Sequence, residues 1–347
     1  MKKMAYILIG FMLVLIGGIG LFLSQIHEES GDEKETEPLS VYEVDLISIK
    51  GTSYLPLPEL VEKAGGAYKY DPIDKQAVIE WFGDRFHMTK GEAVVLVNGY
   101  YKPLSYKMDA GKLLVEYESF KKVFPFYETG SEGQTISLEK RTLPTVVCRP
   151  GDAELNEERM RSMRVPLPNV NFPTLPGQLA GGERAYRNGI HQGIDWYYDG
   201  DNQMVTFDTA VFSMTEGVVV RADHQYNEME EEDRNQFLEI AQEFSTTPAY
   251  ILDKMRGRQV WIQSETGVAV RYAHLYQVDP MMEVGVRVEK GQRVGSTGNS
   301  GTSDGVTYSD EGIHLHSDIL LCGQHFWEYY PRFDEANSRL RSMFEVD

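Results

Sequence analysis

Apolar and polar positions follow three patterns along the chain, and each predicts a different kind of structure. From Ala5 to Leu23 no residue is charged, and a stretch of this length can cross a bilayer core as one helix. Residues 26–40 are polar and charged without an apolar period, which is typical of an extended linker. From Val41 onward, short apolar runs separated by turn residues predict strands.

Residues 41–140 are predicted to form a small α+β module. A helix is expected over Pro58–Ala64, because proline suits the first helical position and the Gly65-Gly66 pair ends the pattern. The remaining apolar runs of this module predict strands at Ala67–Tyr70, Gln76–Trp81, 93–99 and 112–119.

Residues 183–322 are predicted to form a mainly β domain with an antiparallel sheet and a groove, because short strands alternate with glycine turns. A connection rich in proline, glycine and arginine precedes it at 141–182, and a tail follows at 323–347. Within the domain, 224–257 is expected to be a helical insertion. Its apolar residues recur with a helical period at Phe237, Ile240, Ala241 and Phe244.

The apolar stretch at the amino terminus is predicted to be a single transmembrane anchor (1–25). Lys2 and Lys3 precede it and an acidic run follows, so the amino terminus is expected in the cytoplasm and the later domains outside. A cleaved signal peptide is the competing interpretation, although the stretch exceeds the usual h-region and no small-x-small cleavage site stands out. A buried core helix is the remaining alternative.

Charge and cysteine content narrow the functional classes. The chain has 53 acidic and 34 basic residues, a formal net charge of −19, which argues against binding nucleic acid or anionic lipid surfaces. Cys148 and Cys322 are the two cysteines. An extracytoplasmic location permits a disulfide, but the sequence leaves their pairing open.

The segment GIHLHSD (312–318) places two histidines one residue apart. On a strand, His314, His316 and Asp318 would share one face, while the apolar residues between them would face the other way. Such a strand suits either a metal site or an ordinary solvent-facing edge.

A second cluster, GIHQGIDW, contains His191 and Asp195, and strand geometry would again place both on one face. His274 follows in RYAHLY, with strand parity shared with Tyr272 and Val270; alone, it would be read as a core histidine. Two imidazoles and one carboxylate with an open fourth position describe a catalytic zinc site, and also a non-haem iron site. Two further histidines could transfer protons and stabilise an oxyanion.

HQGID, YAHL, VGVRVEKGQRVGSTGNSGTS and HLH occur in this order over roughly 183–320. This set resembles the M23 family of zinc metallopeptidases, of the lysostaphin and LytM type. The resemblance implies one zinc ion, with the ligands His191, Asp195 and His316. It also implies His314 as general base toward the zinc-bound water and His274 as a group that stabilises the tetrahedral intermediate. The substrate class it implies is the peptide of bacterial peptidoglycan.

The amino-terminal module has its own resemblance. YLPLPELVEKAGGAYKYDPIDKQAVIEW, VNGYY and LLVEYESFKKVF resemble the copper amine oxidase amino-terminal-like domain that serves as a stalk in envelope proteins. That setting implies neither copper nor oxidase chemistry, and His87 is the module's single histidine. A spacer or ligand-binding role is therefore expected.

Two departures from the M23 pattern bear on function. Ser317 and Asp318 stand where the family commonly has Phe and Glu, and the insertion, absent from the minimal domain, is expected to form a wall or lid beside the groove. His224 and His325 match no family motif and are expected to be surface or structural residues.

The leading hypothesis is a membrane-anchored extracytoplasmic zinc endopeptidase that hydrolyses peptide bonds of peptidoglycan. The alternative is a non-enzymatic envelope scaffold or activator that binds another cell-wall protein. The sequence leaves open which bond is cut, whether 150–182 cover the groove in a latent form, and the oligomeric state.

Overall fold

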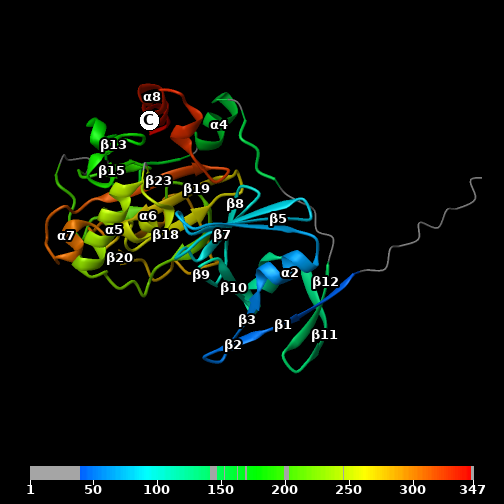
Figure 1. Cartoon of the computed structure of the whole chain (residues 1–347). Helices are drawn as coiled ribbons and strands as arrows, with labels where there is room; N and C mark the ends of the chain where they lie inside the picture. The colour runs from blue at the N-terminus through cyan, green and yellow to red at the C-terminus, as the bar shows by residue number, and fades with distance from the viewer. Residues whose placement is uncertain are drawn as a thin grey trace, which may run out of the picture. The chain divides into compact units, whose positions relative to one another are not determined.

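The structure is a computed structural model. It describes residues 40–140, 147–151, 153–161, 163–168, 170–198, 203–244 and 246–344 (Figure 1). The predicted anchor and the linker up to residue 39 lie outside these ranges. Among the described residues, no helix is long and apolar enough to span a membrane. These residues form 24 strands and seven α-helices, which is consistent with the mainly β domain predicted for residues 183–322.

The amino-terminal module contains three antiparallel sheets and two short helices. Helix α2 (Leu57–Lys63) begins one residue before the predicted helix and ends just before the two glycines. A Cβ atom on the second of them, Gly66, would lie only 2.6 Å from the Trp81 ring. The five-stranded sheet follows chain order: β4 (Ala67–Asp71), β5 (Gln76–Trp81), β6 (Asp84–Thr89), β7 (Val94–Val97) and β8 (Tyr100–Pro103). A four-stranded sheet has the order β2 (Ile47–Ile49), β3 (Thr52–Pro56), β10 (Lys112–Glu116) and β9 (Tyr106–Asp109). A three-stranded sheet has the order β1 (Val41–Asp45), β12 (Thr135–Lys140) and β11 (Phe126–Glu132).

The predicted strand at 112–119 is wrong in its second half, where helix α3 (Tyr117–Val123) begins. The helix forms because Tyr117, Phe120 and Val123 recur every three residues and all three are buried. Phe120 packs in an aromatic cluster, with its ring centroid 4.9 Å from that of Phe124. The core of this module is apolar throughout.

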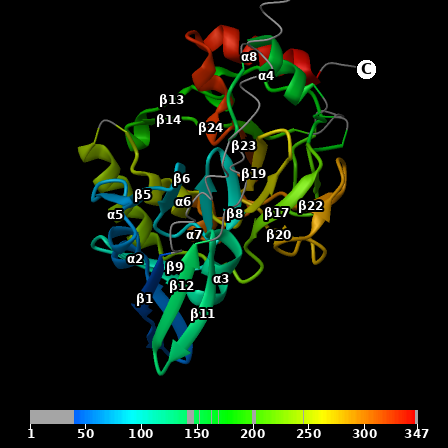
Figure 2. The same ribbon diagram turned by 90° about the vertical axis from the view of Figure 1, so that its right-hand side faces the viewer.

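The carboxy-terminal module is built on one antiparallel sheet, as predicted (Figure 2). Its strands lie in the order β15 (Ile194–Trp196), β23 (Leu315–Leu321), β19 (Val268–Ala273), β18 (Val260–Gln263), β17 (Gly217–Ala222) and β21 (Arg287–Val288), and β24 (Gln324–His325) pairs with β23. Smaller sheets are β16 (Ala210–Phe212), β22 (Arg293–Ser296) and β20 (Gln277–Val278); and β13 (Glu183–Arg184) with β14 (Gly189–Ile190).

One face of the large sheet carries the main apolar core, to which Leu315 and Ile319 of β23 belong. The connection and the tail also contribute to this core, because they carry apolar side chains such as Met160 and Leu340. These belong to helix α4 (Ala153–Met160) and helix α8 (Phe333–Phe344), which lie beside each other in Figures 1 and 2. The connection and the tail are therefore part of the folded carboxy-terminal module, because both contribute side chains to its core.

The insertion is helical, as expected, and contains α5 (Glu231–Glu243) and α6 (Ala249–Met255) between β17 and β18. Ala241 is buried, and Phe237 and Ile240 are half-buried on the same side of α5. One further short helix, α7 (Ser303–Val306), follows β22.

The opposite face of the large sheet contacts the amino-terminal module. Val94 and Tyr101 pack with Trp261 and Leu320 in a separate apolar cluster. A disulfide between Cys148 and Cys322, with Cα atoms 5.3 Å apart, fixes the connection to the end of β23. The sequence left the pairing of these two cysteines open, and the structure shows that they are bonded to each other.

Candidate metal centre and active site

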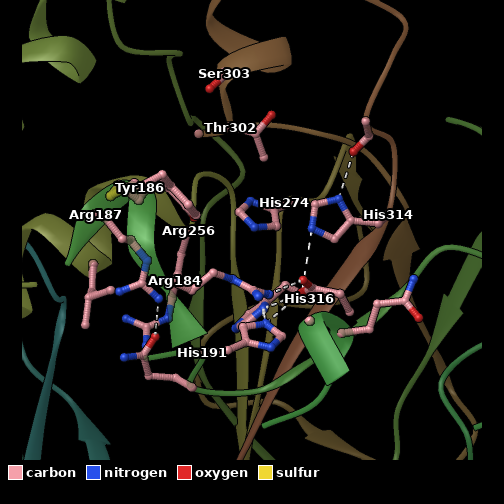
Figure 3. A pocket seen from close by; sticks show the side chains of 18 of the residues that line it. Arg184, Tyr186, Arg187, His191, Arg256, His274, Thr302, Ser303, His314 and His316 are labelled. Atoms are coloured by element: carbon pink, nitrogen blue, oxygen red, sulfur yellow. Dashed lines mark hydrogen bonds and ion pairs between the residues drawn. The ribbon is translucent and has the colours of Figure 1, made fainter. Parts of the chain in front are cut away.

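Three predicted ligands meet at the edge of the large sheet (Figure 3). His191 Nε2 lies 3.0 Å from Asp195 Oδ1 and 3.1 Å from His316 Nδ1, and His316 Nδ1 lies 2.8 Å from Asp195 Oδ1. All three side chains are buried, with at most 6% of each residue exposed. Three atoms that can each donate a lone pair therefore converge on one point.

Strand pairing brings two of these residues together. Asp195 of β15 stands directly opposite His316 of β23 in the antiparallel register, so their side chains emerge on the same face. The predicted alternation on β23 is confirmed, since Leu315 and Ile319 face the core while His316 faces the site.

His191 reaches the site differently from the sequence prediction. It lies in the turn between β14 and β15, not on a strand shared with Asp195. The chain approaches β23 so closely just before β15 that a Cβ on Gly193 would lie 2.2 Å from the carbonyl oxygen of Ser317. This close approach, which the glycine permits, holds the segment that carries His191 against β23.

The outer atom of each ligand has its own partner. His191 Nδ1 lies 2.9 Å from the carbonyl oxygen of Leu179, which can only accept, so Nδ1 carries the hydrogen and Nε2 presents a lone pair. Arg184 Nη2 donates to Asp195 Oδ2 at 2.8 Å, which leaves Oδ1 facing the histidines. These contacts fix the orientation of both side chains, as outer-shell partners do at metal sites.

Asp318 fixes the third ligand. Its Oδ1 lies 2.9 Å from His316 Nε2, and its Oδ2 accepts from Arg256 Nε at 2.9 Å and lies 3.7 Å from Arg271 Nη1. Burial alone would raise the pKa of Asp318, but Arg256 and His316 hold that pKa well below its usual value. Asp318 thus keeps a carboxylate at the position of the family's Glu, and in this structure that carboxylate lies behind His316. The sequence put Asp318 on the right face but did not indicate this role, nor those of Arg184 and Arg256.

The donor set suits a cation such as zinc. Burial alone would raise the pKa of Asp195, but the neighbouring His191 and His314 hold it well below its usual value, so Asp195 is a carboxylate. Burial lowers the pKa of His191, which favours the neutral ring that a metal requires. Burial also opposes protonation of His316, but Asp318 and Asp195 together outweigh it and the pKa is raised. A tetrahedron with ligand distances of about 2.0–2.1 Å has edges of about 3.3 Å, close to the separations seen here.

His314 and His274 lie beside this trio, with their ring centroids 4.7 Å apart. His314 Nδ1 lies 2.8 Å from the carbonyl oxygen of Gly312, and His274 Nδ1 lies 2.7 Å from that of Ser300. Burial lowers the pKa of His314 and lowers that of His274 further. Both rings are therefore neutral and present an Nε2 lone pair that can accept a proton.

The predicted strand parity of His274 with Val270 and Tyr272 is wrong. Those two side chains lie in the apolar core, and continued alternation would direct His274 into the same core. Instead, β19 ends at Ala273 and His274 adopts φ 58°, which turns its ring toward His314. A left-handed backbone conformation at a histidine cannot be derived from the local pattern.

The other two histidines of this module stay outside the site, as expected. His224 Nε2 lies 2.9 Å from the carbonyl oxygen of Met282. His325 belongs to β24, where burial lowers its pKa to about 3. Neither belongs to the metal-ligating group found among the described residues.

The five candidate residues line one cavity of about 580 Å³. The helical insertion contributes Arg234, Leu252, Met255 and Arg256 to its lining. Figure 3 shows Arg184 and Arg187 on the side of the histidines opposite His314. The insertion therefore forms part of the cavity wall, in line with the expectation that it would lie beside the groove.

Comparison with known proteins identifies this module. Residues 189–326 match the family described as peptidase family M23, so this part of the chain is an M23 domain, as the sequence predicted. No curated protein matches the sequence. The resemblance of residues 41–140 to the copper amine oxidase domain stays a prediction.

Several solved structures are similar to parts of the chain. A chain from a SpoIIIAH and SpoIIQ complex shares 22% identity, covering 40% of this chain and 68% of that chain, with a TM-score of 0.25. The catalytic domain of lysostaphin from Staphylococcus simulans shares 18% identity, covering 48% and 85%, with a TM-score of 0.24. A zinc-containing peptidase from Vibrio cholerae shares 13%, covering 72% and 48%, with a TM-score of 0.26.

Proposed function

We propose that the protein is a zinc endopeptidase that hydrolyses peptide bonds of bacterial peptidoglycan. The observation that carries the proposal is the convergence of His191 Nε2, Asp195 Oδ1 and His316 Nδ1 in a cavity of an M23 domain. Peptidoglycan as the substrate rests on the family resemblance, because the cavity alone does not identify a peptide.

The side chains have separate roles in this proposal. His191, Asp195 and His316 would hold the zinc ion, which when bound polarises a carbonyl group and makes water more acidic. His314 accepts a proton through Nε2, which lies 3.7 Å from Asp195 Oδ1 and so at the edge of the metal centre. The family resemblance implies that His274 stabilises the oxygen on which negative charge develops; because Nδ1 already donates to the carbonyl oxygen of Ser300, the neutral ring would have to gain a proton at Nε2 to donate there.

Two observations support an extracytoplasmic location on a membrane anchor. The uncharged stretch from Ala5 to Leu23, with basic residues before it and acidic residues after it, has the pattern of a single-pass anchor. The disulfide between Cys148 and Cys322 suits an oxidising compartment.

The test is to incubate the purified, zinc-loaded protein with peptidoglycan and count newly released amino groups, with and without a chelator. We expect release that the chelator abolishes and that His316→Ala lacks, while His224→Ala, a histidine outside the trio, retains it. Mass analysis of the products would identify the bond. Metal analysis of the active protein would separate zinc from iron.

No release from a folded, zinc-loaded protein would overturn the hydrolase. It would favour the alternative, a non-enzymatic envelope scaffold that binds another cell-wall protein.

A further inference from the structure

Four arginines line the cavity that contains the metal centre, although the chain as a whole is strongly acidic. Arg184 is paired with Asp195, and Arg256 is paired with Asp318. The remaining two, Arg187 and Arg234, belong to the chain segment before His191 and to the insertion, respectively. Neither has an ion pair with a described carboxylate within 4.0 Å.

Arg187 is 4% exposed and bonds to neutral partners. Its Nη1 donates to Thr247 Oγ1 at 2.7 Å, and its Nη2 donates to the carbonyl oxygen of Ile190 at 2.7 Å and to Gln192 Oε1 at 3.0 Å. Burial lowers the pKa of Arg187, but a guanidinium stays protonated in proteins, so the positive charge remains.

Arg234 is 6% exposed and has fewer contacts still. Its Nε donates to the carbonyl oxygen of Gly301 at 3.3 Å, and its two Nη groups donate to no described residue. Burial lowers the pKa of Arg234 and outweighs the opposing influence of Tyr186, Asp304 and Glu228. The end of this side chain is thus a buried fork of donors beside the cavity.

The insertion is fixed in position against the segment that carries Arg187. Gln242 Nε2 of α5 donates to the carbonyl oxygens of Ala185 and Tyr186, at 3.2 and 2.8 Å. Thr247, also in the insertion, both accepts from the Arg187 guanidinium and donates to its carbonyl oxygen. The two arginines are therefore parts of one wall.

A buried charge that has no carboxylate within 4.0 Å is only partly compensated by Asp304 and Glu228, and an anion that enters the cavity would lower that cost. The planar guanidinium donates two parallel hydrogen bonds to a carboxylate, which makes arginine suited to this group. Peptides offer carboxylates at their ends and on acidic side chains, and a cavity of about 580 Å³ has room for such a group beside the metal centre.

We propose that Arg234 binds a carboxylate of the substrate, with Arg187 adding positive charge to the same wall, so that the insertion makes this site selective for peptides that carry a free carboxylate near the cleaved bond. This selectivity rests on the proposed peptidase function for its biological meaning. The binding of the carboxylate itself does not depend on hydrolysis.

The test is equilibrium binding of a synthetic peptidoglycan stem tetrapeptide with all its carboxylates free, compared with the same peptide fully amidated. We expect the wild-type protein to bind the free acid about 10–100-fold more tightly, the range for hydrogen bonds to a charged group. In Arg234→Gln the preference should fall below about 3-fold, with the affinity for the amidated peptide unchanged. The matched control is Arg287→Gln, which removes an arginine that is 61% exposed at its side chain and paired with Glu265, and should keep the preference.

Equal binding of the two peptides by the wild-type protein would overturn the proposal, and this comparison needs no variant to fold. A full preference in folded Arg234→Gln would overturn it as well. Selective binding without cleavage would contradict the hydrolase but support the carboxylate site. Cleavage without any preference for the free acid would support the hydrolase but contradict the carboxylate site.

Discussion

The two modules of the chain use their interiors differently. Among the described residues of the amino-terminal module, Thr89 is the one polar or charged residue that is fully buried, and the core is filled by apolar and aromatic side chains. The carboxy-terminal module buries an ionic network that includes Asp195, Asp318, Arg256 and Arg271. Both modules are β-rich, so the difference lies in what the sheets enclose.

This difference separates stability from chemistry. Apolar burial stabilises a module by about 25 cal/mol per Å², whereas a buried charge pair contributes little net stability. The carboxy-terminal module therefore keeps its ionic network for what it positions, namely His316 and the groups around it. The amino-terminal module, which contacts the face of the same sheet that lies away from the main apolar core, contributes packing. Four substitutions test this division, from the largest expected effect to the smallest.

His314→Ala should lower kcat by about 10²–10⁴-fold, which is the usual contribution of a general base. The substitution removes the Nε2 lone pair that accepts the proton at this position. Zinc content and thermal stability should change little. The control is His87→Ala, the single histidine of the other module, which should leave turnover per folded molecule unchanged. A wild-type kcat in the His314→Ala protein would contradict the role of this residue as general base.

Phe120→Ala should produce the opposite pattern. Phe120 is fully buried, and its removal leaves a cavity that should cost about 3–5 kcal/mol of unfolding free energy, measured by denaturant titration. Zinc affinity of the protein that remains folded should be unchanged. Tyr127→Ala, at a site 41% exposed in the same module, should cost much less. If Phe120→Ala altered zinc affinity, the two modules would not divide stability and chemistry as stated.

Asp318→Asn should weaken zinc binding by about 10–100-fold, the usual effect of removing a partner behind a ligating histidine. It should also destabilise the fold, because Arg256 loses its buried counter-ion. Competition with a chromophoric chelator measures the affinity. Asp109→Asn, which removes an exposed carboxylate paired with Lys90, serves as the comparison and should change neither quantity.

Tyr101→Phe should have the smallest effect. The Tyr101 hydroxyl accepts from Arg271 Nη2 at 2.8 Å across the contact between the modules, and its loss should cost about 1–3 kcal/mol of stability. A loss of zinc affinity as large as that of Asp318→Asn would show that the amino-terminal module positions the metal centre, and would break the division between the modules.

Local patterns predicted what depends on local structure. Strand β5 (Gln76–Trp81) matches its prediction, and the alternation of β23 placed His316 and Asp318 on one face. Both follow from the two-residue period of a strand. The insertion was likewise predicted to be helical from its apolar period.

Features that depend on tertiary contacts were not predictable. His191 owes its position to the close approach of the chain to β23 at Gly193, and His274 to a positive φ just after β19. Neither leaves a periodic signal. The pairing of Cys148 with Cys322 and the clustering of the cavity arginines join residues far apart in sequence, so no local pattern records them.

The most direct test of the central claim is to titrate zinc into metal-free protein while counting the amino groups released from peptidoglycan. If His191, Asp195 and His316 form the single catalytic metal centre, the rate should rise in proportion to added zinc and level off at one zinc per chain. His316→Ala should show no rise over the same range. A rate that is independent of zinc, or the same rise in His316→Ala, would contradict the account.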